Sequence, residues 1–391
     1  MPLSRNVDRK IRIVIIDEEV VVRQLILKVI REDPQIEIVG TFSNISKVAD
    51  TLSNLEPDVI LLDITGKKVN GMDTLEKIHS VFPLLPIIVL SERTELGANK
   101  ALDALERGAI DFVTKPEKSR IIVFADRHFR KRILPVIKSS VKLHEIMWDN
   151  LHKKVKLPQK ISDEEIDIMT NRRVDLVTIG GCTGGPSALF SLIPQLPDDF
   201  PIPIVIAQHM PKFYTNVFAE RLNKLSNLVV QEAYNGAKLE AGHVWIAPGG
   251  YHIVIKRRGI DKVIGLHKGP RENTCRPSID VLFQSASEVY GVNLLGILLS
   301  GRGRDGVKGS KYIRSRGGQL LVQDSTSSLI WELPEAIVRL NLAHKVLPID
   351  KLADELMSLV YANRELTFEI VKDRRHKYID MDNRKSETIQ Y

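Results

Sequence analysis

Short apolar runs separated by longer amphipathic stretches mark the first third of the chain. Three such runs are Ile11–Ile16, Val59–Leu62 and Ile87–Leu90, and a shorter one follows at Phe112–Val113. Runs of this length, rich in Ile, Val and Leu, are typical of parallel strands buried on both faces, with helices between them. The pattern therefore predicts an α/β domain over residues 9–118.

The same alternation returns after residue 173. The expected strands of this second α/β domain, residues 174–363, are Val174–Ile179, Ile202–Ile206, His243–Ile246, Leu294–Leu299 and Gln319–Val322. Stretches such as Ala188–Ile193 and Val217–Leu225 suit the helices between them. We interpret residues 119–173 as a basic linker with a helix around Val136–Leu151, and residues 364–391 as a charged, loosely ordered tail. The fold class is thus α/β, with two doubly wound parallel sheets.

Composition narrows the class of protein. The 391 residues carry a formal charge of +7, and most of the excess lies between Arg127 and Lys160. This stretch lacks a nucleic-acid-binding motif, so a solvated linker is favoured over a DNA-binding surface. No apolar run approaches the roughly 20 residues that span a bilayer, and no signal peptide is evident, so we expect a cytoplasmic protein without membrane insertion. With only two cysteines, Cys182 and Cys275, a disulfide scaffold is excluded.

Chemically active side chains follow each strand of the first domain. Asp17 and Glu18 follow the first apolar run, Asp63 the second, Ser91 the third, and Lys115 the short fourth run. Ligands of open parallel sheets bind beyond the carboxyl ends of the strands, so these side chains should gather at one edge. Clustered carboxylates suit Mg²⁺, an Asp can accept a phosphoryl group, and a Lys and a hydroxyl can hold its oxygens. Singly, each residue could be a helix cap or a turn residue.

The segments IIDEE, DVILLDI, PIIVLS and GAIDFVTKP resemble the signature segments of response-regulator receiver domains, which have a flavodoxin-like fold. The resemblance implies that Asp63 is the phosphoacceptor and that Asp17, Glu18 and Asp63 bind Mg²⁺. It also implies that Ser91 and Lys115 contact the phosphoryl group and that Phe112 occupies the aromatic switch position.

A second set of reactive side chains follows strands of the second domain. Cys182 lies on a glycine-rich turn between an expected strand and helix, where backbone N–H groups and the helix dipole lower a thiol pKa. His209 and Asp305 follow two other strands, so a nucleophile, a base and a carboxylate meet at one edge. The glycines could instead cradle a phosphate, although they lack the G-x-G-x-x-G spacing, and Cys182 alone could be a buried apolar residue.

The blocks IGGCTGGPSAL, QHMPKFYTNVFAERLN, APGGYH, RPSIDVLF, SGRGRDG and VQDSTSS resemble those of chemotaxis protein-glutamate methylesterases. With the receiver in front, the resemblance covers about residues 10–360. It implies a Rossmann-like hydrolase domain that removes methyl esters from chemoreceptor glutamates, and deamidates glutamines in many members, with no cofactor for hydrolysis. A histidine kinase would phosphorylate Asp63 and so uncover the active site.

The chain departs from this family in ways that bear on activity. Cys182 stands where the family has its nucleophilic serine, preceded by Gly181 in place of Ala, and Arg302 and Glu332 replace residues beside the site. Cysteine keeps a nucleophile, so an active hydrolase is favoured, and we expect Arg302 and Glu332 to pair.

Two further hypotheses remain. One is a catalytically impaired relative that binds receptors in a phosphorylation-dependent way. The other, a DNA-binding response regulator, is disfavoured because no helix-turn-helix stretch follows the receiver. Cys275 follows a polar stretch, ENTCRPS, and we expect it to be an ordinary thiol away from the site.

Overall fold

The first domain is a five-stranded parallel sheet with helices on both faces. The computed structural model describes residues 9–43, 48–66, 70–115, 125–152 and 173–361. The strands follow the order β2-β1-β3-β4-β5, and they span β1 (Ile11–Ile16), β2 (Ile36–Phe42), β3 (Val59–Asp63), β4 (Ile87–Ser91) and β5 (Asp111–Thr114). The helices are α1 (Val20–Arg31), α2 (Val48–Leu55), α3 (Gly71–Val81), α4 (Glu95–Glu106) and α5 (Ala125–His152). This is the flavodoxin-like order of doubly wound sheets.

The strand β2 was absent from the pattern-based prediction. Its sequence, IEIVGTF, mixes apolar and polar positions, and most of its residues are partly or fully exposed. It lies at the edge of the sheet and pairs only with β1. An edge strand is half solvated and therefore lacks the uninterrupted apolar run by which the central strands were found.

The helix α5 differs from the expected linker. It begins at Ala125 and ends at His152, within the stretch that we interpreted as a basic linker. Phe129, Ile133 and Ile137 are buried on the first sheet, in one apolar cluster with residues of β1, β3 and α1. The first half of α5 is therefore a structural helix of the first domain, and basic side chains on it form ion pairs with acids of that domain, as Lys138 does with Asp33 at 2.7 Å. Residues 116–124, 153–172 and the tail lie outside the described residues.

The second domain contains a seven-stranded parallel sheet and a separate hairpin. The sheet order is β14-β13-β12-β6-β7-β9-β8, with strands β6 (Leu176–Gly181), β7 (Ile204–Gln208), β8 (Val229–Glu232), β9 (His243–Ile246), β12 (Leu294–Leu298), β13 (Gln319–Gln323) and β14 (Lys345–Leu347). The antiparallel hairpin is formed by β10 (His252–Arg258) and β11 (Asp261–His267). The helices are α7 (Gly185–Leu192), α8 (Tyr214–Leu225), α9 (Ile279–Tyr290), α10 (Val307–Ser315) and α11 (Glu332–Arg339), with 3₁₀ turns η2 (Ile193–Gln195) and η3 (Gly291–Asn293) and a last helical stretch at 349–361.

The order of these strands fixes where a ligand can bind. The strands β7, β9 and β8 lie on one side of β6, and the later strands β12, β13 and β14 lie on its other side. The order reverses between β6 and β12, and such a switch point leaves a crevice at the carboxyl ends of the strands. The predicted fold class, two α/β domains with parallel sheets, is thus confirmed. Among the helices described, none is long and apolar enough to cross a membrane.

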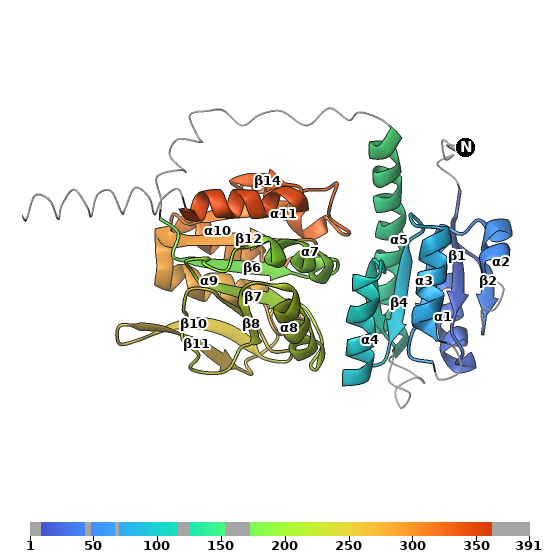
Figure 1. The fold of residues 1–391 in the computed structure, drawn as a ribbon, viewed down its shortest axis with the longest axis horizontal. Helices are drawn as coiled ribbons and strands as arrows, with labels where there is room; N and C mark the ends of the chain where they lie inside the picture. The colour runs from blue at the N-terminus through green and yellow to red at the C-terminus, as the bar shows by residue number, and fades with distance from the viewer. Residues whose placement is uncertain (1–8, 44–47, 67–69, 116–124, 153–172, 362–391) are drawn as a thin grey trace, which may run out of the picture.

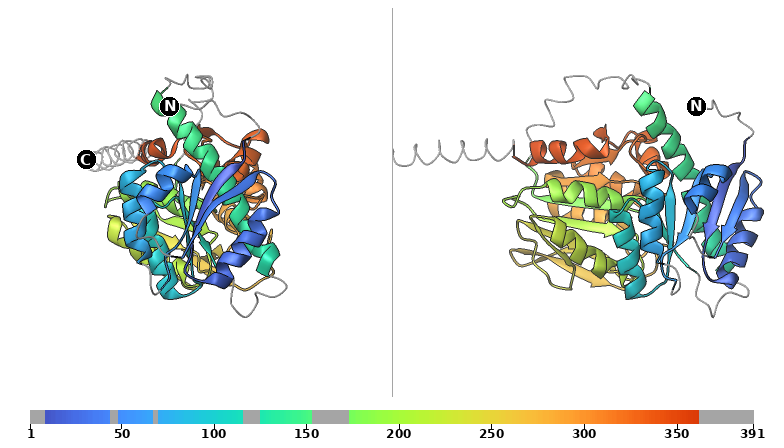
Figure 2. Two further views of the ribbon diagram at one scale, coloured as in Figure 1. Left: turned by 90° about the vertical axis from the view of Figure 1, so that its right-hand side faces the viewer. Right: turned by 45° about the vertical axis from the view of Figure 1, so that its right-hand side comes forward.

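The two domains meet through α4, β5 and α5 of the first and the carboxyl edge of the second (Figures 1 and 2). Arg221 of α8 pairs with Glu106 of α4 at 2.9 Å and donates to the carbonyl of Asn99 at 2.9 Å. On the other side, Arg302 donates to the carbonyl of Lys131 in α5. The first domain therefore covers the switch-point edge of the second.

Candidate active site and phosphoacceptor site

An acidic pocket lies at the carboxyl edge of the first sheet, as predicted. Asp17 follows β1, Asp63 ends β3, and both are almost completely buried. The Lys115 ammonium bridges them, at 2.9 Å from Asp17 Oδ2 and 2.7 Å from Asp63 Oδ2. Burial raises the pKa of Asp17 to about 6 in spite of Lys115, whereas the two carboxylates raise the pKa of Lys115 against the effect of its burial. The carboxylates of Asp17 and Asp63 together therefore carry more negative charge than the single Lys115 ammonium neutralises.

The oxygen atoms of this pocket fit a hard divalent cation. Asp17 Oδ2 and Asp63 Oδ2 are buried and accept no hydrogen bond beyond their ion pairs with Lys115. Glu18 lies over the loop after β3, where a Cβ atom on Gly66 would come within 2.8 Å of the Glu18 side chain. Carboxylate oxygens with room for phosphate are the ligands that Mg²⁺ accepts in such sites.

Ser91 and Phe112 face the second domain instead of this pocket. The phenol of Tyr214, at the start of α8, donates to the carbonyl of Glu92 at 2.7 Å. It lies 2.8 Å from Ser91 Oγ, so the serine hydroxyl donates to it. The ring of Phe112 stacks on Tyr214 with centroids 5.1 Å apart. The structure thus brings Asp17, Asp63 and Lys115 together, but it engages both predicted switch residues in the domain interface.

Cys182 lies on the turn between β6 and α7, at the switch point of the second sheet. Its backbone N–H donates to the carbonyl of Ser300 at 3.1 Å, which ties the turn to the end of β12. Gly184 closes the turn with φ of 78°, and a Cβ atom there would lie 2.6 Å from Ser300 Oγ. A glycine is needed on both counts, because of the left-handed backbone and the close approach. The turn presents the Cys182 side chain at the N-terminus of α7.

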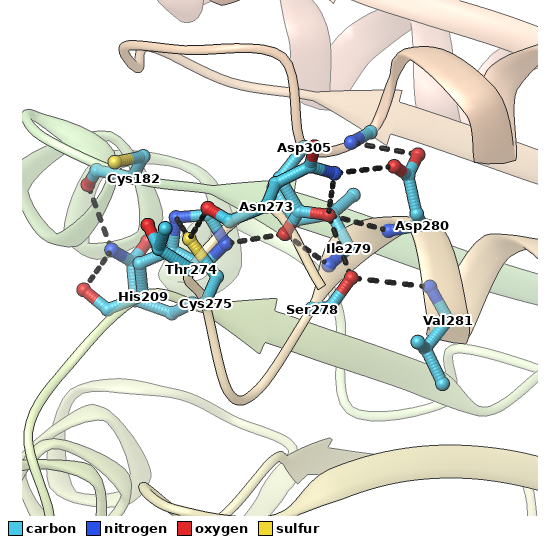
Figure 3. Close-up of polar contacts among 12 residues, drawn as sticks. Cys182, His209, Asn273, Thr274, Cys275, Ser278, Ile279, Asp280, Val281 and Asp305 are labelled. Atoms are coloured by element: carbon cyan, nitrogen blue, oxygen red, sulfur yellow. Dashed lines mark hydrogen bonds and ion pairs between the residues drawn. The ribbon is translucent and has the colours of Figure 1, made fainter. Parts of the chain in front are cut away.

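His209 and Asp305 form a hydrogen-bonded pair beside Cys182 (Figure 3). Nε2 of His209 lies 2.7 Å from Oδ2 of Asp305, and the His209 backbone donates to the carbonyl of Gly181. Asp305 is 2% exposed and also accepts from Ser278 Oγ at 2.6 Å and the Ile279 backbone at 2.8 Å. These donors outweigh burial and lower the pKa of Asp305, so it remains a carboxylate and fixes the imidazole with Nε2 protonated.

The charges of this site favour a thiolate–imidazolium pair. Burial alone would raise the pKa of the Cys182 thiol, but the charge of His209, a hydrogen bond with it, and the backbone N–H groups of Arg302 and Thr183 lower it to about 6. Burial opposes protonation of His209, yet Cys182 and Asp305 raise its pKa well above the ordinary value. Two backbone N–H groups, those of Arg302 and Thr183, thus favour negative charge at this position.

Cys275 belongs to the same cluster, and our expectation that it lies away from the site was wrong. Its Sγ lies 3.7 Å from Nδ1 of His209 and 3.4 Å from the carbonyl of Asn273. Candidate metal-ligand atoms of His209, Cys275 and Asp305 lie within 4.8 Å of one another. Asp305 already accepts several hydrogen bonds with both oxygens, so we interpret the group as a hydrogen-bonded set of Cys182, His209 and Asp305 with Cys275 beside it.

Asp111 of the first domain also lies beside this site, and the sequence did not single it out. Asp111 begins β5 and is 5% exposed, and its carboxylate accepts from the Phe112 backbone at 2.8 Å. Burial raises its pKa to about 7, although Phe112 N–H, the charge of Arg132 and the Gly184 N–H favour the ionised form. The nearby charge of Cys182 adds to the increase. A carboxylate from the receiver side thus faces the turn that carries the candidate nucleophile.

Arg302 and Glu332 pair at the edge of the site, as expected, with Arg302 Nε 3.6 Å from Glu332 Oε2. Both side chains are largely exposed, so this ion pair contributes little to stability. The ion pair lies at the domain interface, because Arg302 also donates to the Lys131 carbonyl of α5. Arg302 therefore joins the active-site loop after β12 to the first domain.

Comparisons with known proteins match both halves of the chain. The CheB methylesterase family matches residues 177–356, and the response regulator receiver domain matches residues 13–125. A protein-glutamate methylesterase/protein-glutamine glutaminase of Trichodesmium erythraeum is 37% identical over 348 residues, covering 89% of this chain and 98% of the relative. One from Pyrococcus abyssi is 32% identical over 360 residues, covering 92% and 95%.

Two solved structures from Thermotoga maritima match one half each. The catalytic domain of its CheB methylesterase is 36% identical, with a TM-score of 0.47, and covers 48% of this chain and 99% of its own. The response regulator domain of its CheB is 30% identical, with a TM-score of 0.31, covering 34% and 98%. A receiver domain in front of a methylesterase domain defines a response-regulator hydrolase. The chain belongs to the protein-glutamate methylesterase/protein-glutamine glutaminase family, whose named members are carboxylic ester hydrolases.

Proposed function

We propose that this chain hydrolyses methyl esters of glutamate side chains on chemoreceptors, with Cys182 as the nucleophile, His209 as the acid–base and Asp305 as the orienting carboxylate. The observation that carries the proposal is the Cys182 thiol, with its pKa lowered to about 6, beside a histidine that is held by a buried carboxylate at 2.7 Å. This arrangement supplies a reactive thiolate and a proton donor at neutral pH.

The reaction follows from the positions of these groups. The Cys182 sulfur attacks the ester carbonyl, and the N–H groups of Thr183 and Arg302 stabilise the negative oxygen of the tetrahedral intermediate. The His209 imidazolium gives its proton to the departing methanol, which leaves a thioester on Cys182. Neutral His209 then takes a proton from water, which attacks the thioester and releases the glutamate carboxylate. Deamidation of glutamine would follow the same path with ammonia as the leaving group.

We propose that phosphorylation of Asp63 controls access to this site. Asp17, Glu18 and Asp63 would hold Mg²⁺, which supplies charge neutralisation for phosphoryl transfer. Lys115 would then bind the new phosphoryl oxygens in place of the free carboxylates. Ser91 would have to leave Tyr214 to reach the phosphoryl group, and Phe112 stacks on the same tyrosine. Phosphorylation would therefore weaken the contacts that hold Asp111 and the receiver over Cys182.

The partners and the division of the chain follow from this function. A histidine kinase would supply the phosphoryl group, and methyl-accepting receptors would be the substrate, both met in the cytoplasm. We propose a receiver that begins near residue 9 and includes α5 beyond residue 118, and a hydrolase domain over residues 174–363.

Incubation of the protein with a methylated receptor fragment tests this function. We expect methanol release that increases when a small-molecule phosphodonor and Mg²⁺ are added. Cys182→Ala should abolish release, with binding of the fragment measured in parallel. If wild-type protein binds the fragment in a phosphorylation-dependent way but releases no methanol above the level of Cys182→Ala, the second hypothesis, a switched receptor-binding protein, replaces the first.

A further inference from the structure

The only two cysteines of the chain converge on one imidazole. Cys182 and Cys275 are 93 positions apart in the sequence, the difference of their numbers, and belong to separate segments of the second domain. The Cys275 sulfur lies 3.7 Å from Nδ1 of His209, and Cys182 contacts the same histidine. Figure 3 shows Cys182 and Cys275 beside His209. A hydrolase triad requires one thiol here and gives no role to the second.

The surroundings of the two thiols differ in a way that suits different roles. Cys182 is held rigidly, because its turn is tied to Ser300 and lies at the start of α7. Cys275 ends a loop, residues 271–274, whose members are all exposed. In that loop Asn273 and Thr274 have positive φ angles of 49° and 67°, which non-glycine residues adopt sparingly. This loop is held by hydrogen bonds of Asn273 with Asp280 and Asp305 and has no buried residues of its own, so it can shift at lower cost than the turn of Cys182.

We propose that Cys182 and Cys275 form a reversible disulfide when the protein meets a peroxide, and that Cys275 is the resolving thiol. The proposal rests on the proposed function only in using the nucleophilic character of Cys182. It assigns a modification site within the catalytic cluster, and it needs no hydrolysis to be observed.

The chemistry proceeds in two balanced steps. The Cys182 thiolate attacks one oxygen of the peroxide, the O–O bond breaks, and the products are a sulfenic acid and water or an alcohol, with the leaving oxygen taking a proton from His209. The Cys275 thiol, with its proton passing to the departing hydroxide, then attacks the Cys182 sulfur and releases water. The net change is two-electron oxidation of two thiols to one disulfide and reduction of the peroxide. Thiol–disulfide exchange with a dithiol reverses it.

The distance between the two cysteines determines whether a sulfenic acid on Cys182 forms a disulfide or is oxidised further. A disulfide requires Cβ atoms about 3.5–4.5 Å apart, so its formation depends on how closely the exposed loop brings Cys275 to Cys182. Both sulfurs start from contact with the same ring, so the movement stays within one loop. Without a second thiol, a sulfenic acid at this site would oxidise further to the sulfinic acid, which ordinary thiols do not reduce. Cys275 would thereby protect the nucleophile while the hydrolase is switched off.

Treatment of the full chain with hydrogen peroxide, followed by mass spectrometry of non-reduced peptides, tests the proposal. We expect wild-type protein to lose both free thiols together, to yield a cross-linked peptide pair containing Cys182 and Cys275, and to regain both thiols with a dithiol. Cys275→Ser should instead gain oxygen atoms at Cys182 and fail to regain the thiol. Cys182→Ser should keep the Cys275 thiol under the same conditions.

Two outcomes would overturn the proposal. One is wild-type protein that accumulates sulfinic acid at Cys182 as fast as Cys275→Ser does, with no cross-linked pair. The other is a disulfide whose yield rises with protein concentration and which joins two chains. Failure of the hydrolase function is separate, because it would be seen as absent methanol release in fully reduced protein, with the thiol chemistry unchanged.

Discussion

Tyr214 of the hydrolase domain stacks on Phe112 of the receiver, with ring centroids 5.1 Å apart and planes 15° from parallel. The same tyrosine is completely buried, and its hydroxyl joins the receiver at Ser91 and at the Glu92 carbonyl. Tyr214, at the start of α8 and five residues after His209, therefore contacts both predicted switch residues of the receiver, Ser91 and Phe112.

Replacing Tyr214 with Phe should raise the hydrolase activity of the unphosphorylated protein. The ring and its stacking on Phe112 remain, but the hydrogen bonds with Ser91 and Glu92 are lost. A hydrogen bond contributes about 0.5–1.5 kcal/mol, so the covered state should lose roughly two- to tenfold in population for each bond. The measurement is methanol release without a phosphodonor, for the variant and for wild type.

Asp63→Asn in the same background separates this effect from phosphorylation. The gain in activity should persist in the double variant, because it comes from the interface. An unchanged basal rate in Tyr214→Phe, with normal folding, would mean that the Tyr214 hydroxyl does not hold the receiver in place.

Asp63 should accept a phosphoryl group from a small-molecule donor only when Mg²⁺ is present. The buried carboxylates of Asp17 and Asp63 repel the donor until a divalent cation offsets their charge. Acid-labile labelling of the intact protein measures the reaction, with a chelator as one control and Asp63→Asn as the other. Labelling of Asp63→Asn at the wild-type level would show that another residue is the phosphoacceptor.

The central strands of both sheets could be predicted from the sequence because burial on both faces leaves continuous apolar runs. The edge strand β2 could not, since its residues are half solvated. The helix α5 was predicted only in part, around Val136–Leu151, and was assigned to a linker because its basic residues dominate the composition. Its apolar residues, among them Phe129, Ile133 and Ile137, recur at helical spacing and are buried on the receiver sheet.

The candidate sites were predicted where a side chain follows a strand, since strand ends meet at one edge. Cys275 and Asp111 were missed for different reasons. Cys275 lies on a loop after the β10–β11 hairpin, and its place beside His209 depends on how that loop folds back. Asp111 begins a strand, and its position over Gly184 depends on docking of one domain on the other. Neither relationship leaves a periodic signal in the sequence.

Asp111→Asn should make Cys182 more reactive towards an anionic reagent in the unphosphorylated protein, mainly above about pH 7. With its pKa raised to about 7, Asp111 is mostly neutral below that pH and mostly ionised above it. The ionised carboxylate repels an anionic reagent that approaches Cys182, so removing its charge should speed alkylation of Cys182 by iodoacetate at pH 8 and leave the rate at pH 5.5 unchanged.

Asp103→Asn is a matched control, because Asp103 also lies at the domain interface, 3.6 Å from Arg221, but on α4. We expect this variant to alter alkylation equally at both pH values, if at all. A pH-independent effect of Asp111→Asn would assign Asp111 a role in docking alone.

The thiolate of Cys182 should depend on His209. With the thiol pKa lowered to about 6, alkylation by iodoacetamide should be half-maximal near pH 6 and should fall as the thiol becomes protonated below it. His209→Ala removes the charge that offsets burial, so the midpoint should move to that of a free thiol, about 8.5, or higher. At pH 7 this shift corresponds to a roughly thirtyfold slower reaction.

Because Cys275 also contacts His209, it cannot serve as the unperturbed reference. The measurement should therefore use the Cys275→Ser background, with and without His209→Ala, and a short cysteine peptide as the standard. A midpoint near that of the peptide in both proteins would remove the thiolate–imidazolium pair, and with it the hydrolytic mechanism.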